Sequence, residues 1–199
     1  MAAELEELLV RDAAGWRAWL QAHHAESPGV WLVLHKKGGS VTELDYAAAL
    51  DEALCFGWID GQTRRRDDAS YLQRMTRRGP RSRWSVRNVG HIDRLETAGK
   101  MTAAGRAAVD AAKSDGRWDT AYSGQATAEV PDDLAAAIAA EPRAQAMFDV
   151  LSSVNRYALI YRTNAVKQAS TRERKIAGFV AMLVRHETPY PQAKRPPAS

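Results

Sequence analysis

Residues 58–77, WIDGQTRRRDDASYLQRMTR, contain the segment that decides the fold. Two extended stretches, about 58–66 and 70–77, flank the turn-forming sequence DDA at 67–69, and this order predicts a β-hairpin. Every second side chain of the later stretch shares a face, which puts Tyr71, Gln73, Met75 and Arg77 on one side and Leu72, Arg74, Thr76 and Arg78 on the other. Neither face is cleanly apolar, so we expect one of them to meet water or an anion.

The sequence before the hairpin predicts one more strand and two helices. VWLVLHKK at 30–37 is short, apolar and partly β-branched or aromatic, as a buried strand is. A helix capped by Asp12 precedes it and stops at the Ser-Pro-Gly sequence 27–29. A second helix is expected from about Asp45 to Gly57, because its apolar residues recur at helical spacing.

After Gly79-Pro80 the pattern is helical throughout. The expected helices have their starts or apolar stripes at Ser85, Thr102, Pro131, Pro142, Tyr157 and Thr171. The predicted fold class is therefore α+β: a small antiparallel sheet with a basic β-hairpin, packed by helices and followed by an all-helical C-terminal module. We expect the α+β region over residues 1–116, a connecting loop over 117–130, the helical module over 131–187 and a disordered tail over 188–199.

Composition excludes several classes of protein. The 199 residues are 45% hydrophobic and 26% charged, with no apolar run of about 18 residues, so no membrane span is expected. The single cysteine excludes a disulfide scaffold. The first residues, MAAELEELLVRD, lack the basic and apolar regions of a secretory signal, and a cytoplasmic location is expected.

Positive charge is concentrated in one segment of the chain. Residues 64–94 hold ten arginines and three aspartates, a net charge of +7, whereas the remaining 18 basic and 21 acidic residues sum to −3. Arginine presents a planar fork of donors that suits carboxylate and phosphate groups. The alternative explanation is that the genome favours arginine generally and that these arginines form a solvated face. The concentration of arginines in one segment favours a binding role instead.

The candidate ligand-binding residues lie on and beside the hairpin. Trp58 and Trp84 flank it and either support an arginine plane or seal the hairpin against the helices. Asp60 is the one acid between Trp58 and Arg66, where it can pair with an arginine. The full candidate set is Trp58, Asp60, Arg64, Arg66, Tyr71, Arg74, Arg77, Arg78, Trp84 and Arg87.

No catalytic, cofactor or metal site is predicted. The chain lacks the nucleophile-elbow, zinc-protease, phosphate-loop and dinucleotide-binding motifs. His23 and His24 are adjacent and point about 100° apart on a helix, so they cannot chelate one ion together. Cys55 lies at the end of an apolar helix, so we expect a buried, unreactive thiol there rather than a nucleophile.

Several separated blocks of sequence resemble the YdeI/OmpD-associated, or bacteriocin-protection, family. These blocks are residues 53–61 (ALCFGWIDG), 71–74 (YLQR), 82–85 (SRWS), 99–102 (GKMT) and 116–118 (GRW). The likeness runs from about Trp31 to Glu187, and residues 155–187 resemble the OmpD-associated C-terminal module. It implies a bacterial protein linked to survival of bacteriocins, cationic antimicrobials or envelope stress, and it carries no catalytic residue.

Three functional classes follow from the residues. The leading hypothesis is a non-enzymatic protein whose arginine-lined hairpin binds an anionic small molecule, partner or surface. Nucleic acid is the alternative partner, with phosphate contacts from arginine and base stacking on Tyr71 or Trp84. A less favoured alternative is an enzyme for a small anionic metabolite, which requires a pocket uniting Asp60, Tyr71, Arg74 and Trp84. The sequence sets no oligomeric state.

Overall fold

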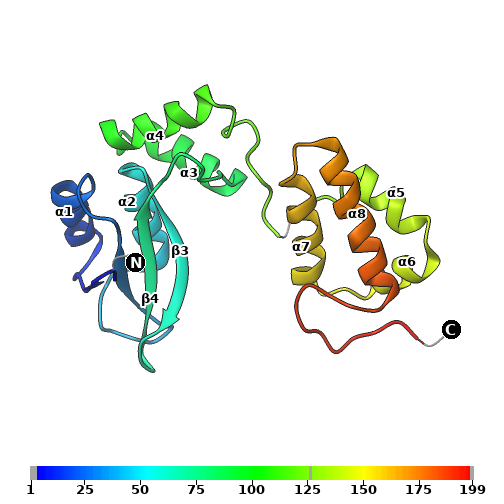
Figure 1. Ribbon diagram of the computed structural model, residues 1–199. Helices are drawn as coiled ribbons and strands as arrows, with labels where there is room; N and C mark the ends of the chain where they lie inside the picture. The colour runs from blue at the N-terminus through cyan, green and yellow to red at the C-terminus, as the bar shows by residue number, and fades with distance from the viewer. Residues whose placement is uncertain (1–3, 126, 198–199) are drawn as a thin grey trace. The chain divides into compact units, whose positions relative to one another are not determined.

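The computed structural model describes residues 4–125 and 127–197. The chain divides between Ala121 and Tyr122 into two compact units, each with its own elements and its own core (Figure 1). The division falls inside the segment 117–130, for which the sequence predicts a connecting loop. The α+β class predicted from the sequence is confirmed.

The first unit contains a four-stranded sheet and four helices. Their order is β1 (Glu7–Leu8), α1 (Ala13–His23), β2 (Val30–His35), α2 (Tyr46–Cys55), β3 (Trp58–Arg65), β4 (Ser70–Arg77), α3 (Val86–Thr97) and α4 (Ala103–Ser114). β3 and β4 form the predicted hairpin, and its turn lies at the end of the ribbon far from α3 and α4 (Figure 1).

The sheet is mixed, which corrects the antiparallel sheet expected from the sequence. Its strand order is β1-β2-β4-β3, and β1 runs parallel to β2 while the other pairs are antiparallel. Parallel neighbours need a crossover connection, and α1 supplies it. β1 has two residues, too few to show an alternating pattern, so it cannot be predicted from the sequence.

Three helix starts predicted from capping residues, and the start near Asp45 predicted from apolar spacing, are confirmed. The side chains of Asp12, Asp45, Ser85 and Thr102 each accept a hydrogen bond from a backbone N–H in the first turn of the helix that follows. Each bond satisfies a donor that the helix itself leaves unpaired. Gly57 ends α2 with φ of +73°, a conformation that glycine adopts without strain.

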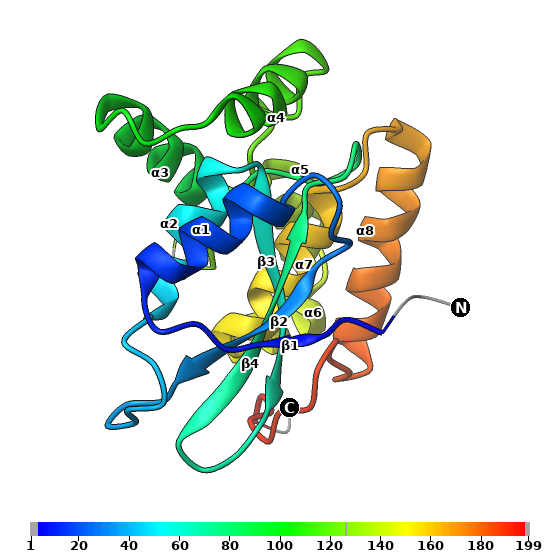
Figure 2. The same ribbon diagram turned by 90° about the vertical axis from the view of Figure 1, so that its left-hand side faces the viewer.

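Both α1 and α2 pack on one face of the sheet, which we call the core face; the opposite side is the outer face. Figure 2 shows α1 lying across the strands on the core face. Residues of both helices and of β2, β3 and β4 share one apolar cluster, including Trp16, Leu20, Leu50, Leu54, Val30, Leu32, Leu34, Trp58 and Met75. The apolar burial that stabilises this unit is therefore concentrated on a single side of the sheet.

The second unit is helical. It consists of α5 (Asp132–Ala139), α6 (Pro142–Asp149), α7 (Ser153–Asn164) and α8 (Ala169–Val184) around a core that includes Leu134, Ile138, Met147, Phe148, Leu159, Ile176 and Leu183. The expected cap of the last helix at Thr171 is wrong. α8 begins at Ala169, three residues before the start that a cap at Thr171 implies, and the Thr171 hydroxyl donates to the Gln168 side chain at 3.1 Å.

Residues after α8 are hydrogen-bonded to α7 through Asn155, whose side chain is fully buried. Asn155 Nδ2 donates to the carbonyl of Tyr190 at 3.0 Å and to the side chain of Gln192 at 2.8 Å, and its Oδ1 accepts from the Tyr190 N–H at 2.8 Å. Asn155 thus helps to hold part of the segment for which the sequence predicts disorder, and Gln192 adds bonds to the Ser152 N–H and the Val150 carbonyl.

Candidate anion-binding site

A β-bulge in β3 determines which arginines of the hairpin reach the outer face. The pairing with β4 shifts by one residue between Asp60 and Thr63, so β3 holds one residue more than its partner. The nearly buried Gln73 donates from Nε2 to the Gly61 carbonyl at 2.9 Å, which satisfies the interrupted backbone. In an uninterrupted strand Asp60 and Arg64 would share a face; the extra residue puts Asp60 on the core face and Arg64 on the outer face.

Two of these arginines meet Trp31 on the outer face. Trp31 of β2 lies directly opposite Arg74 of β4 in the antiparallel ladder. Arg64 pairs with Leu72, and its side chain reaches over β4 so that its guanidinium carbon lies 4.3 Å from the centroid of the Trp31 ring. Trp31, Arg64 and Arg74 therefore form one continuous patch, which we call the arginine–tryptophan surface.

The stacked geometry leaves the hydrogen-bonding edge of Arg64 available. A guanidinium over an indole interacts through its flat face, whereas its N–H donors point outward in the plane of the group. Arg64 is exposed and Arg74 partly buried. Among the described residues, neither forms an ion pair with a carboxylate. The surface thus offers two cationic groups on one face, one of them oriented by Trp31.

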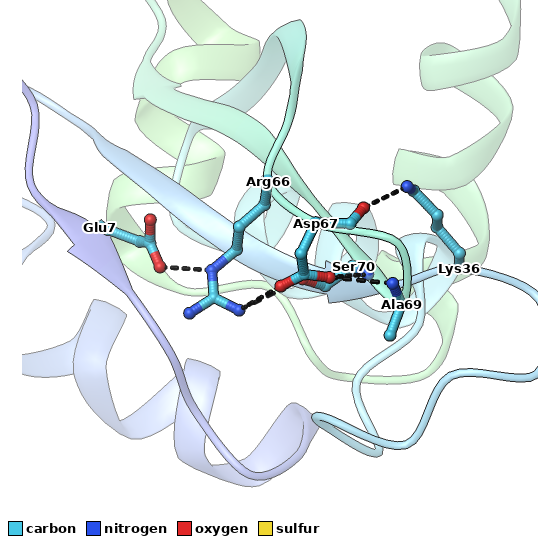
Figure 3. A network of polar contacts seen from close by, with 6 residues as sticks. All are labelled: Glu7, Lys36, Arg66, Asp67, Ala69 and Ser70. Carbon is cyan, nitrogen blue, oxygen red and sulfur yellow. Dashed lines mark hydrogen bonds and ion pairs between the residues drawn. The ribbon is translucent and has the colours of Figure 1, made fainter.

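Arg66 shares the outer face but is neutralised by carboxylates (Figure 3). Its Nε donates to Glu7 of β1 at 2.5 Å, and its Nη1 donates to Asp67 at 3.0 Å and to the Ser70 hydroxyl at 3.2 Å. This network joins the hairpin turn to the opposite edge of the sheet. Because its donors are occupied by these side chains, Arg66 stabilises the turn and is not part of the arginine–tryptophan surface.

Asp67 organises the hairpin turn. Its Oδ1 accepts from the backbone N–H groups of Ala69 and Ser70, its Oδ2 accepts from the Ser70 hydroxyl, and its carbonyl accepts from Lys36 Nζ (Figure 3). These three donors to its carboxylate, led by the Ser70 hydroxyl, lower the pKa of Asp67 because each favours the ionised form. The predicted turn is therefore held by the Asp67 side chain itself.

The two tryptophans that flank the hairpin in sequence lie in the core. Trp58 is fully buried and donates from Nε1 to the carbonyl of His24 at 3.1 Å. Trp84 is 1% exposed, and the guanidinium carbon of Arg78 lies 3.6 Å from its ring centroid. Arg77 donates to the carbonyl of Ala25 at 2.8 Å. These four side chains are not part of the outer face.

Asp60, Tyr71 and Arg87 belong to the other side of the sheet. The Tyr46 hydroxyl at the start of α2 donates to Asp60 Oδ2 at 2.8 Å. Burial, and then the bond to Asp60, raise the pKa of Tyr46, while the charge of Arg87 acts in the opposite direction. Tyr71 is partly buried against the core helices. An acid, two tyrosines and an exposed arginine of α3 thus gather near the core helices.

The pocket required by the enzyme hypothesis is not assembled by the predicted residues. Asp60 and Tyr71 lie on the core face, Arg74 lies on the outer face, and Trp84 is buried beneath Arg78. The described residues also contain no group of three or more His, Cys, Asp or Glu side chains suited to a metal ion.

Sequence reasoning missed Trp31 and Glu7. Trp31 is buried, as the apolar strand pattern predicts, but it lies on the face opposite Val30, Leu32 and Leu34, which belong to the core cluster. The alternation of side chains along a strand could have placed Trp31 on the other face. In a strand whose residues are all apolar, however, alternation does not show which face meets the core. Glu7 lies in the short strand that no pattern reveals.

The fold and this surface define an α+β protein with an arginine-bearing mixed sheet and a separate helical unit. Residues 8–108 match the family described as a domain of unknown function (DUF8412), which covers more than half of the chain, and the protein belongs to that family. Residues 127–186 match the family described as bacteriocin-protection, YdeI or OmpD-associated, so the predicted resemblance is confirmed for this segment.

No curated protein and no solved structure matches the chain. None of the helices in the described part of the chain has the length and apolar content of a segment that crosses a bilayer.

Proposed function

We propose that this chain is a non-enzymatic binding protein whose arginine–tryptophan surface takes up an anionic group of a ligand or partner. One observation carries the proposal: Arg64 and Arg74 share a face without a carboxylate partner among the described residues, and Trp31 fixes the plane of Arg64. A preset guanidinium loses less side-chain entropy on binding than a free one, so the stack favours recognition of carboxylate or phosphate.

The energetics favour a ligand with more than one anionic group. A hydrogen bond to a charged group contributes about 1.5–3 kcal/mol, so two arginines together give an isolated anion roughly millimolar affinity. Base stacking has less support here, because Trp31 is 6% exposed and already covered by Arg64. We therefore place small polyanions and acidic protein surfaces before nucleic acid.

Titration with inorganic phosphate and citrate, followed by backbone amide NMR shifts, tests the proposal. We expect the shifts to centre on β2 and β4 around Trp31 and Arg74. Arg64→Ala and Arg74→Ala should each weaken citrate binding by about fivefold or more. The matched control is Arg81→Ala, because Arg81 is an exposed arginine of the same unit that lies outside the sheet.

Two results would contradict this function. Equal, small losses in all three variants would mean that only the overall positive charge attracts the anion. Tighter binding of a single-stranded oligonucleotide than of citrate, with a steep dependence on salt, would instead assign the protein to the nucleic-acid class.

The description of the family matched by residues 127–186 extends the proposal to a protective role. We infer that anion binding by the first unit serves survival of a bacteriocin challenge. Cells that carry the Arg64→Ala, Arg74→Ala double variant should survive such a challenge less well than cells with Arg81→Ala. Equal survival of the two strains, at equal protein level, would show that anion binding does not serve protection.

A further inference from the structure

An apolar groove lies along α8 in the second unit. Its volume is about 880 Å³, and its floor consists of small and aliphatic side chains of α8 with Ala137 of α5. Ala177 and Ala181 line it and are exposed. Alanines on a helix surface allow a second helix to approach to about 8–10 Å between axes. The groove therefore has the form of a helix-docking site.

The two ends of the groove carry opposite charges at matched positions. Glu173, Ala177, Ala181 and Arg185 follow one another at four-residue intervals, so they form one ridge of the helical surface, continued past the end of α8 by Arg185. Glu173 is exposed and forms no ion pair with any described residue. Arg185 pairs with Glu187 through Nε and Nη2, its side chain is 58% exposed, and Nη1 takes no part in that pair.

This ridge is complementary to itself when it is reversed. Turning a second copy by 180° about the middle of Ala177 and Ala181 brings Glu173 opposite Arg185 twice and each alanine opposite the other. Within one chain the two charges are 12 residues apart, about 18 Å along the helix, too far for direct contact. Their complementarity is satisfied only between two molecules.

We propose that the groove along α8 is the interface of a two-fold symmetric dimer, and that its occupant is α8 of a second copy in antiparallel orientation. Such an interface is isologous, so each favourable contact occurs twice. Burial of the aliphatic floor supplies the affinity, and the two Glu173–Arg185 pairs fix the register and direction of the helices. The proposal is independent of anion binding by the first unit.

Sedimentation of the full chain over a range of concentrations tests the dimer. We expect a reversible monomer–dimer equilibrium. Ala181→Glu should weaken the dimer by about tenfold or more, because it puts a charge on each side of the apolar contact. Ala136→Glu is the matched control, since Ala136 is an exposed helical alanine of the same unit that does not line the groove. Circular dichroism checks that each variant is folded.

Charge exchange identifies the partner and the direction of docking. Glu173→Arg alone and Arg185→Glu alone should each weaken the dimer by about tenfold, because each puts two like-charge pairs in contact. The double variant should return to within about threefold of the original affinity. A chain that is monomeric at every concentration up to about 0.5 mM, a dimer that tolerates Ala181→Glu, or a double variant without recovery would overturn the proposal.

Discussion

The guanidinium carbon of Arg64 lies 4.3 Å from the ring centroid of Trp31, although β4 separates the strands that carry them. The contact spans the sheet diagonally, over Leu72 of β4. It therefore depends on the register of three strands at once. A cation oriented in this way is a product of the folded sheet, and no local sequence motif encodes it.

Removal of this stack should uncover Trp31. In Arg64→Ala we expect stronger quenching of tryptophan fluorescence by iodide and a loss of about 0.5–1 kcal/mol in the free energy of unfolding. The difference between backgrounds with and without Trp31→Phe isolates the signal of this ring from the other tryptophans. Arg64→Met keeps an unbranched side chain over the indole and serves as the control. Unchanged quenching in Arg64→Ala would show that the indole is covered by other groups.

Close contact between α2 and α4 should make Gly105 intolerant of any side chain. A Cβ atom at Gly105 would lie 2.2 Å from the carbonyl oxygen of Cys55, and that carbonyl also accepts a hydrogen bond from the Thr102 hydroxyl at 2.6 Å. We expect Gly105→Ala to lower the free energy of unfolding by about 1–3 kcal/mol, as overpacking does.

The control for this substitution is another helical glycine. Gly90 of α3 has open space where its Cβ would be, so Gly90→Ala should stabilise the protein by about 0.4–1 kcal/mol. Chemical denaturation measures both changes. Effects of equal sign at the two positions would mean that helix propensity decides the outcome at Gly105 and that α2 and α4 are further apart.

Acid should loosen the hairpin turn through Asp67. The pKa of Asp67 in the folded protein lies below its ordinary value of 3.8, so the carboxylate stabilises the turn above that pH. This stabilisation is lost as the pH falls below 3.8 and through the lowered pKa. Hydrogen exchange of the Ala69 and Ser70 amides, followed by NMR, should therefore accelerate in that range, and Asp67→Asn should show fast exchange already at neutral pH.

Asp68 provides the comparison for this pH effect. Its side chain is 96% exposed and accepts a hydrogen bond from the exposed Arg65 at 2.8 Å. Asp68→Asn should leave the exchange of the two amides close to that of the unaltered protein. Similar acceleration in both variants would attribute the acid response to the general charge of the turn.

Loss of Asn155 should release the segment after α8. Asn155→Ala removes the hydrogen bonds that its side chain makes to Tyr190 and Gln192, and each such bond contributes about 0.5–1.5 kcal/mol to stability. Trypsin should then cleave faster after Lys194, whereas the bond after Arg195 precedes Pro196 and stays resistant. Val154→Ala, at a neighbouring position that is 49% exposed, is the control. Equal cleavage rates in the two variants would show that other contacts hold the segment.

Local rules predicted the helices well because each start carries its own chemical signal. The caps at Asp12, Asp45, Ser85 and Thr102 act on the turn that follows them and need no distant partner. Thr171 failed because a threonine inside the first turn of a helix looks the same in sequence as one that precedes it.

The arginine–tryptophan surface was harder to predict from the sequence than the helices, because it depends on pairing between strands that are far apart in the chain. The hairpin and its arginines were predicted, and so was the grouping of Leu72 with Arg74 on one face. The face of Arg64 depends on the extra residue between Asp60 and Thr63, for which Gly61 inside the strand is a weak local signal. Trp58 and Trp84 are close to the arginines in sequence, yet both side chains are buried in the core and do not line the surface.

The bulge in β3 also bears on aggregation. β3 is an edge strand, and a long regular edge offers a template on which strands of other molecules can add. The extra residue breaks the even spacing of the free backbone groups, and the arginines of the strand repel a like-charged neighbour. Replacing Arg64 and Arg65 by apolar residues should therefore promote self-association of the protein even where no ligand is bound.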